Sequence, residues 1–185
     1  IHHFVRFCLL VCLLISLLVI DGSHIQAAPL ASVSFTVNST ADIRDANPGN
    51  GVCETATGNG VCTLRAAIQE TNALTGADTI TLPSGTYTLT IAGVNEDLST
   101  KGDLDIRESL TIGGAGQVNT IIDGNGLDRE FHLSGTSAQV TISDVTIRNG
   151  NVGLDYGGGI RINSTNTMNI VNSKIAGNNG ERGGG

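Results

Sequence analysis

Residues 120–126 read Thr-Ile-Ile-Asp-Gly-Asn-Gly, and this stretch returns twice with small changes, as residues 145–151 and as residues 173–179. The central isoleucines of the three copies, Ile122, Ile147 and Ile175, recur at a nearly constant spacing. Self-similarity with a period of about 20 to 50 residues indicates an architecture of stacked repeats. The repeats therefore decide the fold class.

A second series of strand-like segments has a similar spacing. Its marker isoleucines are Ile112, Ile142 and Ile170. An antiparallel meander gives no reason for such a period, whereas a coil of parallel turns stacks equivalent residues about 4.8 Å apart. We therefore expect an all-β chain, folded as a parallel β-helix that is right-handed by the crossover rule. About four turns are expected between Ile80 and Ile175.

The core of such a coil must be aliphatic, because aromatic residues make up only 3% of the chain and tryptophan is absent. The net charge of −7 and the pI near 4.8 argue against nucleic acid as a partner, since nucleic-acid binding depends on neutralising phosphates. An acidic, soluble surface is the simpler interpretation.

Residues 1–27 have the organisation of a secretory signal peptide. Arg6 precedes an apolar run at residues 7–20, and Ala27 ends a plausible cleavage site. This run is too short to span a bilayer comfortably, since a membrane helix needs about 20 apolar residues, although an uncleaved anchor is the alternative. We expect a secreted or cell-surface protein with no membrane span in its mature part.

Removal of the signal would leave two of the four cysteines, Cys53 and Cys62, nine positions apart. In an exported protein such a pair most simply forms a disulfide, here closing a small loop rich in glycine, asparagine and aspartate. A zinc site is the alternative, but it needs more ligands, and His132 is far away in the sequence.

Residues 63–74 carry the one helical pattern of the predicted mature chain. Apolar or small side chains recur at i, i+3, i+4 and i+7, namely Leu64, Ala67, Ile68 and Thr71. Thr63 is suited to be the N-cap and Gly76 to end the helix. A single helix beside a stack of strands can cover the open end of the first turn. We expect an N-terminal region at residues 28–77 and coil turns at residues 78–185.

Residues 62–68, Cys-Thr-Leu-Arg-Ala-Ala-Ile, resemble the motif of the CSLREA-domain proteins. Residues 46–53 and 77–87 are similar to that family too, and residues 157–160 resemble repeats of polymorphic outer-membrane proteins and of the pectate-lyase-like superfamily. The resemblance implies an exported bacterial protein in which a helix and loop lead into a right-handed parallel β-helix. The family has no general assigned reaction.

One departure from the family motif concerns the helix start. The family's Ser-x-x-Glu is a capping box, whereas this chain has Thr63-x-x-Ala66, so that half of the box is missing. This favours a structural role for the motif.

Several charged residues are candidates for catalysis. Asp123 and Arg148 occupy equivalent positions and read either as the start of a substrate groove or as an ion pair between turns. Further charged positions are Asp103, Asp105, Arg107 and the stretch 128–130. Two carboxylates at about 5 to 10 Å can hydrolyse a glycoside. The polygalacturonase and pectate-lyase patterns are not met, so we predict no catalytic residue, and we expect His132 to be a rim residue.

The best group of oxygen ligands lies in the loop before the helix and consists of Asp42, Asp45, Asn47 and Asn50. Hard oxygen ligands in a glycine-rich loop suit calcium. Turn formation explains the same residue types equally well. Calcium at these residues is the only cofactor that the sequence suggests.

The functional expectation is a secreted or cell-surface structural or adhesive module, with surface polysaccharide or another surface component as its partner. The alternative is a polysaccharide lyase or glycoside hydrolase whose active site lies on turns beyond residue 185. Residues 183–185 repeat the triple glycine of residues 157–159, so we expect further turns to follow. Those turns are where the active site of this alternative would lie.

Overall fold

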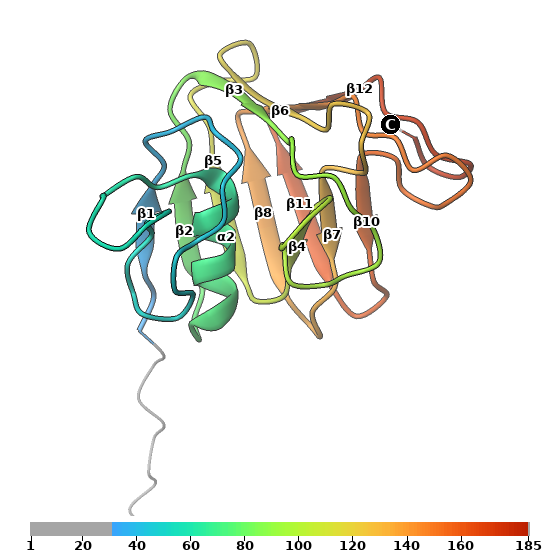
Figure 1. Ribbon diagram of the computed structural model, residues 1–185. Helices are drawn as coiled ribbons and strands as arrows, with labels where there is room; N and C mark the ends of the chain where they lie inside the picture. Colours follow the sequence, from blue (N-terminus) through green and yellow to red (C-terminus); the bar gives the residue numbers. More distant parts are fainter. Residues whose placement is uncertain (1–30, 185) are drawn as a thin grey trace, which may run out of the picture.

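A computed structural model describes residues 31–184, so the signal peptide predicted for residues 1–27 lies outside the described residues. The described chain winds into a parallel β-solenoid of about 3 turns (Figure 1). The sequence predicted about four turns, and this number was too high by one.

Three parallel sheets form the sides of the coil. The first contains β1 (Ser34–Thr36), β2 (Asp78–Thr81), β5 (Leu110–Gly113), β8 (Gln139–Ser143) and β11 (Thr167–Val171). The second contains β4 (Leu104–Ile106), β7 (Phe131–Leu133) and β10 (Ile160–Ile162). The third contains β3 (Gly85–Thr88), β6 (Thr120–Asp123), β9 (Thr146–Arg148) and β12 (Lys174–Ala176).

The marker isoleucines stack as predicted. In the third sheet Ile122 pairs with Ile147 and Ile147 with Ile175; in the first sheet Ile112 pairs with Ile142 and Ile142 with Ile170. The second sheet adds a ladder that was not predicted, in which Leu104, Phe131 and Ile160 are partners in register. Apolar ladders from all three sheets thus face the inside of the coil, where their first members form the core.

The helix α2 (Leu64–Ala73) lies at the first turn, where it contacts β2 and β4 (Figure 1). Thr63 is its N-cap, and the Thr63 hydroxyl accepts a hydrogen bond from the Ala66 amide at 3.1 Å. The predicted apolar stripe is buried, and the N-terminal cap position is confirmed.

The helix is buried on more than its apolar stripe, because two loops cover its other side. Arg65 is 1% exposed, and its guanidinium pairs with Asp42, with 2.5 Å between Arg65 Nε and Asp42 Oδ1. The same guanidinium donates hydrogen bonds to the carbonyl oxygens of Ser99, Gly102 and Asp103. Arg65 therefore joins the helix to the loop that precedes β4.

The disulfide between Cys53 and Cys62 is present, as predicted. It ties the loop before α2 to the residue preceding the N-cap, and both cysteines are buried in the core. Within residues 31–184, no helix is both long enough and apolar enough to cross a membrane.

The isoleucine ladder gives a first prediction. Ile147, the middle of its ladder, is fully buried, so Ile147→Ala should lower the free energy of unfolding by about 2 to 5 kcal/mol, through lost burial and the cavity left behind. Ile43→Ala makes the same chemical change at a residue that is 45% exposed, and it should lower the free energy of unfolding clearly less. Urea unfolding of both variants measures this. Equal losses would show that Ile147 is not a core position.

Candidate functional site

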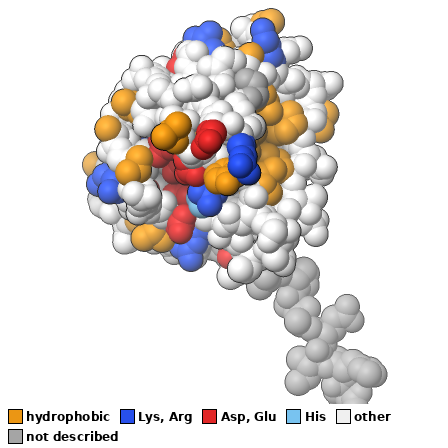
Figure 2. All heavy atoms as spheres, turned by 90° about the vertical axis from the view of Figure 1, so that its right-hand side faces the viewer, with side chains coloured by type: hydrophobic (Ala, Val, Ile, Leu, Met, Phe, Trp, Pro, Cys, Tyr) orange, Lys and Arg blue, Asp and Glu red, His pale blue; other side chains and the backbone are white. Residues whose placement is uncertain are grey.

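A polar cleft of about 670 Å³ lies over the outer face of the β4–β7–β10 sheet. Its walls come from the loops between β3 and β4, between β6 and β7, and between β9 and β10. The lining residues are mainly charged or amide-bearing: Asn95, Glu96, Asp97, Asp103, Asp128, Arg129, His132, Asn151, Asp155, Arg161 and Asn163, with Val94, Leu127 and Val152. Figure 2 shows carboxylates gathered around a histidine in a hollow of the surface, with cationic side chains beside them.

Strand alternation and register place three of these side chains in a row. Residues 104, 131 and 160 point inward, so the next residue of each strand points outward. The parallel register pairs Asp105 of β4 with His132 of β7, and His132 with Arg161 of β10. An outward ladder of carboxylate, imidazole and guanidinium results.

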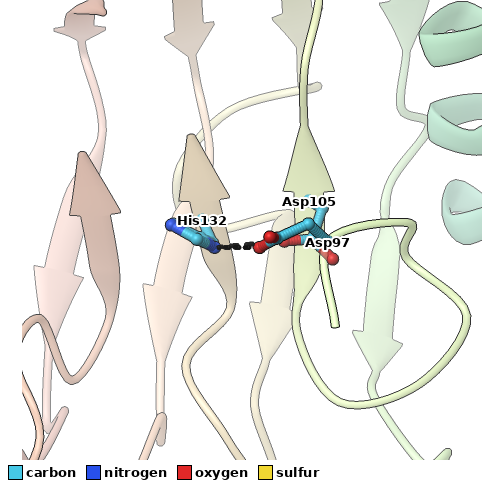
Figure 3. A group of neighbouring side chains, drawn as sticks. All are labelled: Asp97, Asp105 and His132. Carbon is cyan, nitrogen blue, oxygen red and sulfur yellow. Dashed lines mark hydrogen bonds and ion pairs between the residues drawn. The ribbon is translucent and has the colours of Figure 1, made fainter. Parts of the chain in front are cut away.

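His132 is the centre of the closest group. His132 Nδ1 lies 3.2 Å from Asp105 Oδ1 and 3.2 Å from Asp97 Oδ1, and Nε2 lies 3.3 Å from Asn163 Oδ1. Figure 3 shows His132 directed toward both aspartates. The hydrogen bond with Asp105 raises the pKa of His132, and burial opposes this. The expectation of a rim histidine was wrong, because His132 is only 8% exposed and bonded on both ring nitrogens.

A second group surrounds Arg129. Its Nη1 lies 2.8 Å from Asp103 Oδ2, and its Nη2 lies 2.9 Å from Asp155 Oδ2. Burial raises the pKa of Asp103 to about 7; the negative charges of Asp105 and Asp128 add to this, and Arg129 opposes it. A carboxyl group that titrates near neutral pH can either donate or accept a proton.

Glu130 lies behind this group and is fully buried. Its Oε1 accepts a hydrogen bond from the Gly124 amide at 3.0 Å, and a Cβ atom at Gly150 would come within 2.5 Å of its Oε2. Burial raises the pKa of Glu130 to about 9, so the group is neutral at pH 7. Glycine at position 150 gives this carboxyl group its space.

The sequence did not reveal this convergence. It marks Asp103, Asp105, Arg129 and Glu130 only as charged strand or turn residues, and it gives no reason to single out Asp97. The signal that could have found the row was the shared alternation of the segments 104–106 and 131–133. Arg107, which the sequence groups with Asp103 and Asp105, is exposed and does not line the cleft.

The other predicted charged pair lies on a different side of the coil. Arg148 Nε is 2.9 Å from Asp123 Oδ2, across neighbouring strands β9 and β6 of the third sheet. The side-chain Nδ2 of Asn149 also donates a hydrogen bond to the Asp123 carboxylate. The ion-pair interpretation fits this geometry, and for such a partly exposed pair a contribution of about 0 to 1 kcal/mol is typical.

The candidate calcium ligands hold the loop before α2. Asp42 pairs with Arg65 and accepts the amides of Thr90 and Ile91. The carboxylate of Asp45 accepts the amides of Asn47 and Glu54, and the side chain of Asn50 accepts the Val52 amide. The bonds of Asp45 to Asn47 and of Asn50 to Val52 are turn contacts, whereas Asp42 ties the loop to α2 and to the segment after β3. Calcium at this loop stays a prediction.

Comparison of the chain with protein-family models, with curated proteins and with solved structures gave no match.

The buried Glu130 predicts a pH dependence of stability. An unfolded glutamate releases its proton near pH 4.5, but folded Glu130 keeps it to about pH 9, so stability falls as pH rises between these values. Glu130→Gln mimics the neutral form and should remove this slope, which is at most about 1.4 kcal/mol per pH unit. Urea unfolding from pH 5 to pH 8 measures the difference.

Glu181→Gln, the same substitution at an exposed position, is the control for this test, and its pH curve should run parallel to that of the wild type. A Glu130→Gln curve that also runs parallel to the wild type would show that Glu130 is not held neutral.

Proposed function

We propose that this protein is an exported β-solenoid module whose polar cleft binds a saccharide at the cell surface or outside the cell. The observation that carries the proposal is the cleft itself. It is large enough for a small saccharide and is lined mostly by groups that donate or accept hydrogen bonds. Sugar hydroxyl groups need both kinds of partner.

The polar groups in the cleft are held in place before any ligand arrives. Arg129 is fixed between Asp103 and Asp155, and His132 is fixed between Asp105 and Asn163. Preorganised groups lose little conformational freedom on binding, which favours affinity. Arg161 and Asp155, which are each close to half exposed, lie where a ligand can reach them.

Export and family membership belong to the same proposal. A disulfide persists in oxidising compartments, which supports a location outside the cytosol. The signal-like residues 1–27 and the CSLREA-like residues 62–68 agree with this location. We take the coil to be right-handed, as the crossover rule requires.

The saccharide proposal predicts different effects for two matched arginines. Arg161 and Arg148 have equally exposed side chains, at 41% each, and each pairs with one aspartate, but only Arg161 lines the cleft. Glycan-array screening followed by calorimetry should find a ligand whose affinity falls about tenfold or more in Arg161→Ala, a change of about 1.4 kcal/mol. Arg148→Ala should bind as the wild type does.

Two outcomes contradict the proposal. Either no glycan binds the wild type, or both arginine variants lose affinity equally, which would indicate non-specific attraction to positive charge.

Cleavage of the bound glycan is a second candidate function, and the pKa of Asp103 favours it. A buried carboxyl group with a pKa of about 7, beside other carboxylates in a cleft, is suited to general acid–base catalysis. Incubation with pectin, alginate and related polymers should then release new chain ends, with activity that changes between pH 6 and pH 8. If no products form at any pH, the cleavage function is contradicted and only the binding function remains.

A further inference from the structure

Three ligand atoms of a kind that binds metals converge at one edge of the cleft. They are the Nδ1 atom of His132 and one carboxylate oxygen each from Asp97 and Asp105, and all lie within 4.8 Å of one another. Each comes from a different segment: Asp105 from β4, His132 from β7, and Asp97 from the loop before β4 (Figure 3). We propose that Asp97, Asp105 and His132 bind a divalent transition-metal ion, and that zinc fits the site best.

The distances suit a metal ion. Zinc lies about 2.0 to 2.2 Å from nitrogen and oxygen ligands, so two ligands at the tetrahedral angle are about 3.3 Å apart. Both carboxylate oxygens lie 3.2 Å from Nδ1. A zinc ion could therefore occupy the space between the three atoms with little movement of the two buried residues.

The surroundings of the ligands orient them. The other carboxylate oxygen of Asp105 accepts the Ser99 amide at 3.0 Å, and the Asp105 amide donates to the Ser99 hydroxyl at 2.7 Å. The other ring nitrogen of His132 faces Asn163 Oδ1, an acceptor. A proton on Nε2 leaves the Nδ1 lone pair directed at the two carboxylates. Partners of this kind hold metal ligands in protein sites.

The third ligand, Asp97, faces solvent, since its side chain is 67% exposed. The loop that carries it is held from within, because the Glu96 carboxylate accepts the amides of Leu98 and Lys101 at 2.9 and 2.8 Å. Three protein ligands leave a fourth position on the cleft side for water or for a bound molecule. This is the arrangement of an open zinc site.

The ligand types select among metals. Calcium and magnesium prefer oxygen ligands alone, and calcium takes six to eight of them. An imidazole nitrogen with two carboxylates suits zinc and its first-row neighbours instead. Further negative charge from Glu96, which also lines the cleft, favours a cation at this position, and the guanidinium groups of Arg129 and Arg161 in the same cleft oppose it.

The same three side chains could form only an ion pair between histidine and aspartate, and a metal titration separates the two cases. Protein freed of metal with EDTA and then desalted is titrated with zinc chloride by calorimetry. We expect one saturable site whose affinity falls at least tenfold in Asp97→Asn, a substitution at an exposed side chain. His132→Gln should lose the site as well.

Asp155→Asn is the matched control, since it removes one carboxylate from the same cleft and leaves the three ligands intact; its zinc affinity should remain within about threefold of the wild type. Histidines in residues 1–30 are common to every variant and cannot explain a difference between them. Absence of a saturable site, or equal losses in Asp97→Asn and Asp155→Asn, would overturn the proposal.

The metal proposal does not depend on the saccharide proposal. Arg161→Ala should keep its zinc affinity whatever its effect on glycan binding. Zinc binding without any glycan ligand would therefore contradict only the saccharide function, and glycan binding without zinc would contradict only the metal site.

Discussion

The parallel, in-register pairing of successive turns is the constraint on which the rest of this structure depends. It stacks Leu104 under Phe131 and Phe131 under Ile160 on the inside of the coil. The same pairing necessarily stacks Asp105, His132 and Arg161 on the outside. A shift of one residue would exchange the two sets, placing charges in the core, so burial of the apolar ladder fixes the outward row as well. The core and the cleft thus have one physical origin.

Arg65 extends this constraint to the loops. Its guanidinium is fully buried, pairs with Asp42, and binds three carbonyl oxygens between Ser99 and Asp103. That segment leads directly into β4 and follows the loop that carries Asp97. Leaving either partner of a buried ion pair without the other generally costs about 3 to 5 kcal/mol. Gln69 and Asn72 of the same helix also donate hydrogen bonds to the carbonyl oxygens of Ser99 and Asp105. The helix motif is therefore connected to the cleft, and the ion pair and hydrogen bonds of Arg65 explain why this charged residue stands in a buried position of α2.

The sequence predicts the fold well because the Ile122 and Ile112 series carry a strong, repeated marker. The third ladder escaped prediction because its members differ, as leucine, phenylalanine and isoleucine, and its strands are short. If that ladder is not recognised in the sequence, nothing indicates that His132 lies beside Asp105 and Arg161. Asp97 lies in a loop without periodicity, so only the three-dimensional path of that loop brings it to His132. Residues placed by strand register were within reach of sequence reasoning, and residues placed by loop geometry were not.

The most direct test of this account is a crystal structure of the protein grown with zinc, with anomalous diffraction data collected at the zinc edge. The account predicts Asp105 and His132 side by side on the outer face of β4 and β7, with an anomalous peak about 2.0 to 2.2 Å from His132 Nδ1 and from the oxygens of Asp97 and Asp105. A structure in which Asp105 and His132 lie on different faces of the coil, or in which the peak lies away from them, would contradict it.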